Sequence, residues 1–225
     1  MINKDQGRRS FLKLGATSVG SLLIAAPVSK AVAGACGITP VQTSGPFYPG
    51  EQKFHPDNDL TQVTGRTGKA LGQVIYVRGK AVNTACAPVR GATVEIWQAC
   101  ASGKYNHPDD PNTAEMDPNF KYWGEATTDQ NGQYLFKSIV PGAYPADTNW
   151  MRPPHVHFKV SKLGFHELTT QMYFKGNKFN KQDLILNKIS PSERTSVLVD
   201  FQPSPTEFEA DALVGHFDIT LSPVR

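Results

Sequence analysis

The stretch RPPHVHFKV, residues 152–160, has the alternation of a β-strand and carries two histidines two positions apart. In an extended chain, His155 and His157 point to one face, and the apolar residues between and after them point to the other. The two prolines before His155 stiffen the entry to the strand and hold Arg152 close to the histidines. The apolar face predicts a core position, whereas the imidazole pair indicates either a metal site or two histidines that face solvent.

Other segments with strand-forming patterns lie on both sides of this stretch, and an Asn131-Gly132 turn precedes one of them. The clearest are residues 73–82, 92–99, 155–160, 168–174, 195–201 and 216–222, together with the part of 127–144 that follows the turn. Only residues 180–190 suggest a short helix, and 19 glycines and 17 prolines in 225 residues favour turns. The sequence therefore predicts an all-β fold, a Greek-key β-sandwich with long loops and at most short helices.

Residues 1–35 have the features of a twin-arginine-type signal peptide, with Arg8-Arg9 before a modest apolar stretch that ends in small residues. The stretch is too short and too rich in Gly, Ala and Ser for a membrane span. We expect residues 36–225 to form one domain that is periplasmic or secreted, with no stable membrane span. The alternatives are an amphipathic N-terminus, an uncleaved anchor, or a lipid anchor at Cys36.

The charge balance argues against an anionic partner. The whole chain has a formal net charge of +3, and removal of residues 1–35 would take away +4 and leave about −1. The basic character therefore belongs to the leader, so nucleic acid is not expected as a partner. Composition leaves a homo-oligomer open.

Three cysteines allow three disulfide pairings with one thiol left over. We favour Cys36–Cys86, because Cys100 lies near the candidate chemistry described next.

No further histidine or carboxylate lies at a spacing from the histidine pair that would mark it as a third metal ligand. HExxH, DxDxDG and GxSxG motifs are missing from the sequence. Tyrosine is the remaining candidate. Tyr105 follows the strand predicted at 92–99, and Tyr144 is expected in a turn eleven residues before His155. Either tyrosine alone is more often a loop residue with its hydroxyl in water.

Four segments together resemble the intradiol ring-cleavage dioxygenases of the protocatechuate 3,4-dioxygenase type. They are GATVEIWQACASGKY (91–105), GQYLFKSIVPGAYP (132–145), RPPHVHFKV (152–160) and LTTQMYF (168–174), in the order of that family. QTSGPFYPG (42–50) is similar to its N-terminal segment and GHFDITL (215–221) to its last strand. The resemblance covers residues 38–221.

The resemblance implies a non-haem Fe(III) centre with four ligands, Tyr105, Tyr144, His155 and His157. It makes Tyr144 and His157 axial and lets Tyr144 leave when substrate binds and take up a proton. Phenolates are hard anionic donors, which suits Fe(III). The implied reaction joins O2 to a catechol-type substrate and cleaves the ring between the two hydroxyl-bearing carbons, giving a cis,cis-muconate-type dicarboxylic acid.

The resemblance also implies roles for Arg152, as a cation that stabilises negative charge on the ring, and for Gln171, which orients a ligand or the substrate. The alternatives are a surface salt bridge for Arg152 and a strand hydrogen bond for Gln171.

Other readings of the whole chain compete with this one. The sandwich pattern also resembles transthyretin-like modules that bind or support without catalysis. His155 and His157 with a third ligand would suit a zinc hydrolase, and a non-catalytic subunit of the family would lack ligands.

Overall fold

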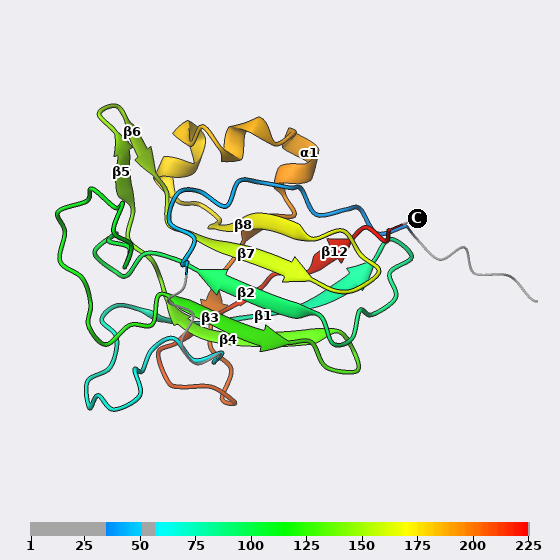
Figure 1. Ribbon diagram of the computed structural model, residues 1–225, viewed down its shortest axis with the longest axis horizontal. Coiled ribbons are helices and arrows are strands. Elements are labelled where there is room, and N and C mark those ends of the chain that lie inside the picture. The colour runs from blue at the N-terminus through cyan, green and yellow to red at the C-terminus, as the bar shows by residue number, and fades with distance from the viewer. Residues whose placement is uncertain (1–34, 51–56, 225) are drawn as a thin grey trace, which may run out of the picture. The chain divides into compact units, whose positions relative to one another are not determined.

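Two five-stranded sheets dominate residues 35–50 and 57–224, the part of the chain that the computed structural model describes (Figure 1). The first sheet contains β1 (Val74–Asn83), β4 (Gln133–Ile139), β10 (Gln202–Pro203), β11 (Leu213–His216) and β12 (Ile219–Leu221). The second contains β2 (Thr93–Trp97), β3 (Trp123–Thr127), β7 (His155–Ser161), β8 (Leu168–Phe174) and β9 (Leu198–Val199). A separate hairpin consists of β5 (Tyr144–Asp147) and β6 (Trp150–Arg152).

The long strand β1 organises the first sheet. It pairs antiparallel with β4 on one side and parallel with β11 and β12 on the other, where those two strands follow one another along its length. Alternate residues of β1, among them Ile75, Val77 and Ala81, are completely buried, as a strand with one core-facing side requires.

The inner faces of the two sheets share one hydrophobic core. Ile75 of β1 and Phe136 of β4 belong to the same buried cluster as Ile96 of β2 and Phe158 of β7, and all four are 0% exposed. The rings of Phe136 and Phe158 meet edge-on across the gap, with centroids 6.4 Å apart. This cluster joins the sheets face to face and confirms the prediction of an all-β sandwich.

The strands with the clearest alternation are confirmed. The predictions at 73–82, 92–99, 155–160 and 168–174 correspond to β1, β2, β7 and β8. The prediction at 195–201 is wrong for most of its length, because only Leu198–Val199 pairs as β9. The sequence did not indicate β3, whose Gly124 lies so close to Leu60 that a Cβ there would be 2.5 Å from Leu60 Cδ1.

The helices are short, as predicted. The segment expected as one short helix at 180–190 is instead spanned by separate turns, η1 (Lys178–Gln182) and η2 (Leu186–Lys188), followed by α1 (Pro191–Arg194). Within the described residues, a helix with the length and apolar character needed to cross a bilayer is not found. Residues 1–34 of the predicted signal peptide lie outside the described residues.

Residues 36–48, here named the N-terminal strap, run along the second sheet without forming a strand, turn at residues 46–47, and appear in blue beside β8 in Figure 1. A disulfide between Cys36 and Cys86 ties one end of the strap to the turn after β1, which confirms the favoured pairing. The remaining cysteine, Cys100, is a buried free thiol. Further along, the backbone N–H of Gln42 donates to the carbonyl oxygen of Thr169 in β8, with a donor–acceptor distance of 2.8 Å.

Reduction of this disulfide is expected to lower the free energy of unfolding by about 2–4 kcal/mol, because the bridge closes a long loop in the unfolded chain. The two cysteines are 50 residues apart. Urea unfolding with and without reductant measures the effect, and the Cys36→Ser/Cys86→Ser variant should be insensitive to reductant. An unchanged unfolding midpoint for the wild-type chain in reductant would contradict the expectation.

Candidate metal centre

The two histidines of β7 lie on the outer face of the second sheet. Val156 and Phe158 point into the core and are 0% exposed, while His155 and His157 lie on the opposite face and are each 2% exposed. The predicted alternation is therefore present, but the histidine face is covered rather than open. The alternative of two solvent-facing histidines is wrong.

Aromatic side chains from three segments cover the histidine face. Phe47 of the strap packs against Tyr105 from the loop after β2, with ring centroids 4.8 Å apart. Tyr144 from the β5–β6 hairpin meets the ring of Tyr105 edge-on at 5.5 Å. Together with Trp97 and Trp123 of the sheet, these residues form a second, smaller hydrophobic cluster that excludes water from the histidines.

The ring of His157 is held between a strand neighbour and the strap. Trp97 lies opposite His157 in the β2–β7 ladder, and the two rings stack with centroids 4.8 Å apart and planes within 8°. On the strap, Gly45 has a φ of +67°, and a Cβ there would lie 3.3 Å from Cε1 of His157. Glycine therefore lets the strap backbone adopt this conformation and approach the imidazole closely.

The hydrogen bonds of His155 assign its tautomer. Its Nδ1 lies 2.7 Å from the carbonyl oxygen of Pro153, so Nδ1 carries the proton and donates. Nε2 of His155 is consequently a bare acceptor, and it faces Nε2 of His157 at 3.2 Å and the Tyr105 hydroxyl at 3.5 Å. Burial, and then the nearby charge of Arg152, hold the pKa of both imidazoles well below their ordinary value. Both rings are therefore neutral and can donate a lone pair to a cation.

The two predicted tyrosines reach the same place from different segments. The backbone N–H of Tyr105 donates to Oδ2 of Asp110 at 2.7 Å, which fixes the loop that carries it. Tyr144, expected in a turn, is instead the first residue of β5 and pairs with Arg152 of β6. Burial raises the pKa of both tyrosines above the ordinary value, and the neighbouring Tyr144 raises the pKa of Tyr105 further. A bound cation would be needed to stabilise either one as a phenolate.

This donor set fits a ferric ion. Two nitrogens about 2.1 Å from one ion and at right angles to each other are roughly 3.0 Å apart. The Nε2 atoms of His155 and His157 are 3.2 Å apart, close to that separation. The other two donors are hard phenol oxygens, which Fe(III) prefers. Among the described residues, no group of three or more His, Cys, Asp and Glu side chains could hold a metal. A zinc site built from those residue types would therefore lack its third ligand.

Arg152 is buried beside these donors. Its side chain is 4% exposed, and its Nε donates to Oδ2 of Asp183 at 2.7 Å. The alternative of a surface salt bridge is wrong, because both members of this ion pair are inside the protein. The positive charge of Arg152 also lowers the pKa of Tyr144 against the effect of burial, so its field reaches the donors.

Gln171 connects Arg152 to the strap. It pairs with His157 in the β7–β8 ladder and is 0% exposed. Its Oε1 accepts from Nη2 of Arg152 at 2.6 Å, and its Nε2 donates to the carbonyl oxygen of Thr43 at 2.8 Å. The structure thus brings together all six residues that the sequence singled out: Tyr105, Tyr144, Arg152, His155, His157 and Gln171.

Sequence reasoning missed several partners of these side chains. The Tyr173 hydroxyl lies 2.8 Å from Oε1 of Gln42 and 2.9 Å from Oε1 of Gln171, so it can donate to either one. Asp183 directly precedes the apolar residues 184–186, and nothing in that segment marks its carboxylate as a partner of Arg152. Trp97 and Phe47 could have been found, since both lie in the segments that carry the family resemblance.

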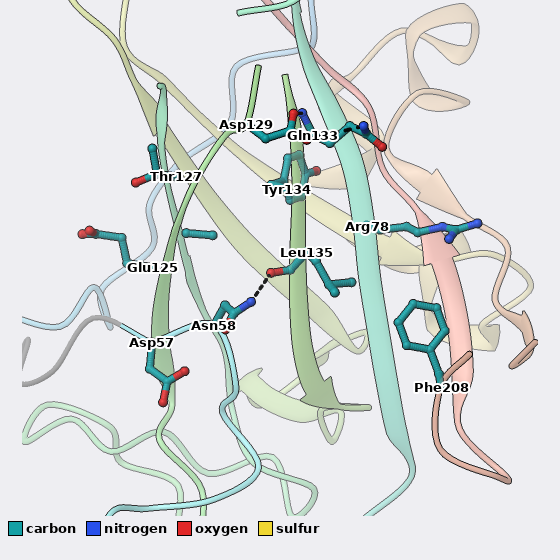
Figure 2. A pocket seen from close by; sticks show the side chains of 11 residues that line it. Asp57, Asn58, Arg78, Glu125, Thr127, Asp129, Gln133, Tyr134, Leu135 and Phe208 are labelled. Atoms are coloured by element: carbon teal, nitrogen blue, oxygen red, sulfur yellow. Dashed lines mark hydrogen bonds between the residues drawn. The ribbon is translucent and has the colours of Figure 1, made fainter. Parts of the chain in front are cut away.

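A separate cavity of about 560 Å³ opens between β3 and β4, and Figure 2 shows the side chains around it. Asn58 donates to the carbonyl oxygen of Leu135 beside it, at 3.1 Å. The lining residues do not include any of the six candidate site residues; they are Asp57, Asn58, Arg78, Glu125, Ala126, Thr127, Asp129, Gln133, Tyr134, Leu135 and Phe208. This cavity is therefore distinct from the candidate metal centre.

Comparison with known proteins supports the same reading. A family model described as a dioxygenase matches residues 43–223. The beta chain of protocatechuate 3,4-dioxygenase from Burkholderia cepacia is 39% identical over 179 residues, which cover 78% of this chain and 76% of that protein. The chain belongs to the intradiol ring-cleavage dioxygenase family. A catechol 1,2-dioxygenase from Candida albicans is 32% identical over 145 residues, which cover 57% of this chain and 45% of that protein. The match therefore spans less than half the length of the Candida relative.

Solved structures of this family share the fold. The dioxygenase domain of a dioxygenase carbohydrate-binding protein fusion from Streptomyces sp. SirexAA-E superimposes with a TM-score of 0.61 at 28% identity, covering 84% of this chain and 100% of that one. An intradiol ring-cleavage dioxygenase from Tetranychus urticae gives a TM-score of 0.65 at 21% identity, covering 84% of this chain and 97% of that one. The second likeness concerns the fold alone. With the family established, the transthyretin-like module is not favoured.

If these four side chains bind the metal, removal of one donor should abolish stoichiometric binding. We expect Tyr105→Phe and His155→Ala to hold less than about a tenth of the wild-type metal content, because each leaves an incomplete ligand set in a buried site. Metal analysis of purified protein measures this. Tyr76→Phe and His166→Ala change the same residue types outside the centre and should keep the metal. A Tyr105→Phe or His155→Ala variant with full metal content would show that the assignment is wrong.

Proposed function

We propose that this dioxygenase holds Fe(III) through Tyr105, Tyr144, His155 and His157 and cleaves a catechol-type ring between its two hydroxyl-bearing carbons with O2. The product would be a cis,cis-muconate-type dicarboxylic acid. The observation that carries the proposal is that Nε2 of His157 and the hydroxyl of Tyr105 both lie within 3.5 Å of Nε2 of His155 in a buried, aromatic-walled site. Membership of the intradiol family supports the reaction type.

A bound ferric ion would supply a Lewis acid that draws electron density from the catechol ring and makes it reactive toward O2. The protein would supply a fixed set of neutral nitrogens. The Pro153 carbonyl holds His155 in one tautomer, and Trp97 holds the plane of His157. Partners of this kind orient metal ligands and strengthen them as donors.

Tyr144 is the group we assign to accept a catechol proton. Its hydroxyl lies in a buried site, and burial raises its pKa above the ordinary value. A phenolate in that environment is a strong base, so it can take up a proton from a substrate hydroxyl once it is free of other partners. Tyr105 is more deeply buried and held by Asp110, which suits a permanent donor.

Arg152 would stabilise negative charge that develops on the ring. Its guanidinium is held by Asp183 and Gln171, and its field already lowers the pKa of His155, His157 and Tyr144. A cation fixed in advance in a water-poor site stabilises developing charge without reorganising during the reaction. The substrate is proposed only as a catechol, since the relatives' names include protocatechuate, catechol, chlorocatechol and hydroxyquinol enzymes.

Oxygen uptake against a panel of catechols tests the function. The iron-loaded protein should be reddish through tyrosinate-to-iron charge transfer, consume O2 with at least one catechol and release a muconate-type diacid. The panel should include catechol, protocatechuate, hydroxyquinol and a chlorocatechol. A yellow semialdehyde product would mean cleavage beside the hydroxyl-bearing carbons and would contradict the proposal. Zinc with full activity on an ester or amide would favour the hydrolase instead.

We also propose that the chain is exported by its N-terminal segment, of the twin-arginine type, and acts in the periplasm or outside the cell. The Arg8-Arg9 pair before an apolar stretch supports this. The Cys36–Cys86 disulfide supports it independently, because such bonds persist in oxidising compartments. Twin-arginine export moves folded proteins, which would suit an enzyme that folds around a metal.

A fusion of residues 1–36 to a reporter should be exported in a wild-type bacterium and retained in a strain that lacks the twin-arginine translocase. The Arg8→Lys/Arg9→Lys fusion provides the matched control, since it keeps the charge but removes the arginine pair and should be retained in both strains. Export that persists in the translocase-deficient strain would contradict this proposal.

A further inference from the structure

Asp183 is a carboxylate buried behind the candidate metal centre. It is 0% exposed and follows η1, in a segment that lies between β8 and α1 in the chain. Its Oδ2 accepts from Nε of Arg152 at 2.7 Å. A buried carboxylate or guanidinium is costly unless it is paired and hydrogen-bonded, so each of these two ions depends on the other.

The second carboxylate oxygen of Asp183 fixes the turn in which it lies. Oδ1 accepts from the backbone N–H of Ile185 at 3.1 Å and of Leu186 at 2.7 Å. The backbone carbonyl oxygen of Asp183 accepts from Nδ2 of Asn187 at 2.7 Å. The two backbone N–H groups therefore hold the carboxylate in one orientation, whereas Asn187 contacts only the backbone of the turn.

Arg152 is thus contacted by two different elements. Asp183 accepts from Nε, and Gln171 of β8 accepts from Nη2. Gln171 is itself fixed by its hydrogen bond to the Thr43 carbonyl. Two acceptors on two different nitrogens define the plane of a guanidinium, not merely its position.

We propose that Asp183 is a positioning residue for the ring-cleavage reaction: it orients the guanidinium of Arg152 toward the bound catechol. The inference rests on the proposed function, since it takes Arg152 to stabilise charge on the substrate. Asp183 also partly neutralises Arg152, so the pair leaves a directed N–H donor rather than an uncompensated charge beside the metal. It reaches the chemistry only through Arg152.

The Asp183→Asn variant tests the proposal. An amide can accept from Arg152 or from the backbone N–H groups of the turn, but it cannot do both without placing its NH2 group against donors. We expect kcat to fall roughly 10–100-fold, as for other partners that orient active-site groups, with KM changed less than threefold and the iron content unchanged. An unchanged kcat would overturn the proposal.

Asn187→Ala is the matched control for a purely structural role. Asn187 holds the same turn through the carbonyl oxygens of Asn180, Lys181 and Asp183, and it does not contact Arg152. This variant should lower Tm but keep kcat within twofold of wild type. An equal loss of kcat in Asn187→Ala and Asp183→Asn would overturn the proposal, because loosening of the turn would then explain both.

A double-variant cycle with Arg152→Gln shows whether Asp183 acts through Arg152. In the Arg152→Gln background, Asp183→Asn should lower kcat less than twofold further, whereas losses that multiply would overturn the proposal. If Asp183→Asn alone fails to fold, the double variant should fold, because it no longer contains an unpaired buried cation. A double variant that is no more stable than Asp183→Asn would count against the ion pair.

A readout without turnover separates this inference from the proposed function. The Nε–H proton of Arg152 in the metal-free full chain should exchange slowly with water in NMR spectra of the wild type and of Asn187→Ala, and rapidly in Asp183→Asn. Slow exchange in all three would overturn the positioning role. If the wild type does not turn over any catechol, the proposed function fails, and this exchange measurement still decides whether Asp183 orients Arg152.

Discussion

Two buried imidazoles whose Nε2 atoms lie 3.2 Å apart set the conditions that the surrounding structure has to meet. At that distance the two nitrogen lone pairs need either a shared proton or a shared cation between them. Because Nδ1 of His155 already carries its proton toward Pro153, its Nε2 must be the electron-pair donor. Burial makes protonation of either ring costly, so both imidazoles are neutral, and His157 can either donate an Nε2–H to His155 or share a cation with it.

The surrounding polar groups form a second layer that keeps the first one in place. Gln171 lies at its centre, because it links the backbone of the strap to the guanidinium of Arg152. Asp183 completes the arrangement by accepting from Nε of that guanidinium. Each of these groups is buried and each has partners for its charge or its polar atoms, as a buried polar network requires. Loss of one member leaves another unsatisfied, so these residues act as a unit rather than as separate contacts.

The sequence predicted the sandwich through local patterns, and the family resemblance singled out the six candidate residues that the structure brings together. Period-two alternation reports which side of a strand is buried, and the family motifs contain Tyr105, Tyr144 and the residues around His155. Asp183 could not be predicted in the same way, since its partner is 31 positions away and its segment is not one of the family motifs. Strand β9 was overestimated because the apolar residues at 195–201 pack into the core mainly without ladder pairing. The burial of Asp183 and the length of β9 depend on contacts between distant segments, which local composition does not report.

Both faces of strand β7 are used. Its even-numbered residues from Val156 to Val160 fill the common core, and the odd-numbered His155 and His157 face the candidate metal. A change of side-chain volume at Phe158 would move the backbone that aims both imidazoles, so core variants of this strand become functional variants as well. A substitution that is neutral elsewhere in the sandwich could impair two things in this strand, the packing of the core and the geometry of the site. Evolution of a new substrate preference would therefore have to proceed through the segments that cover the site, leaving this strand as the unchanging template.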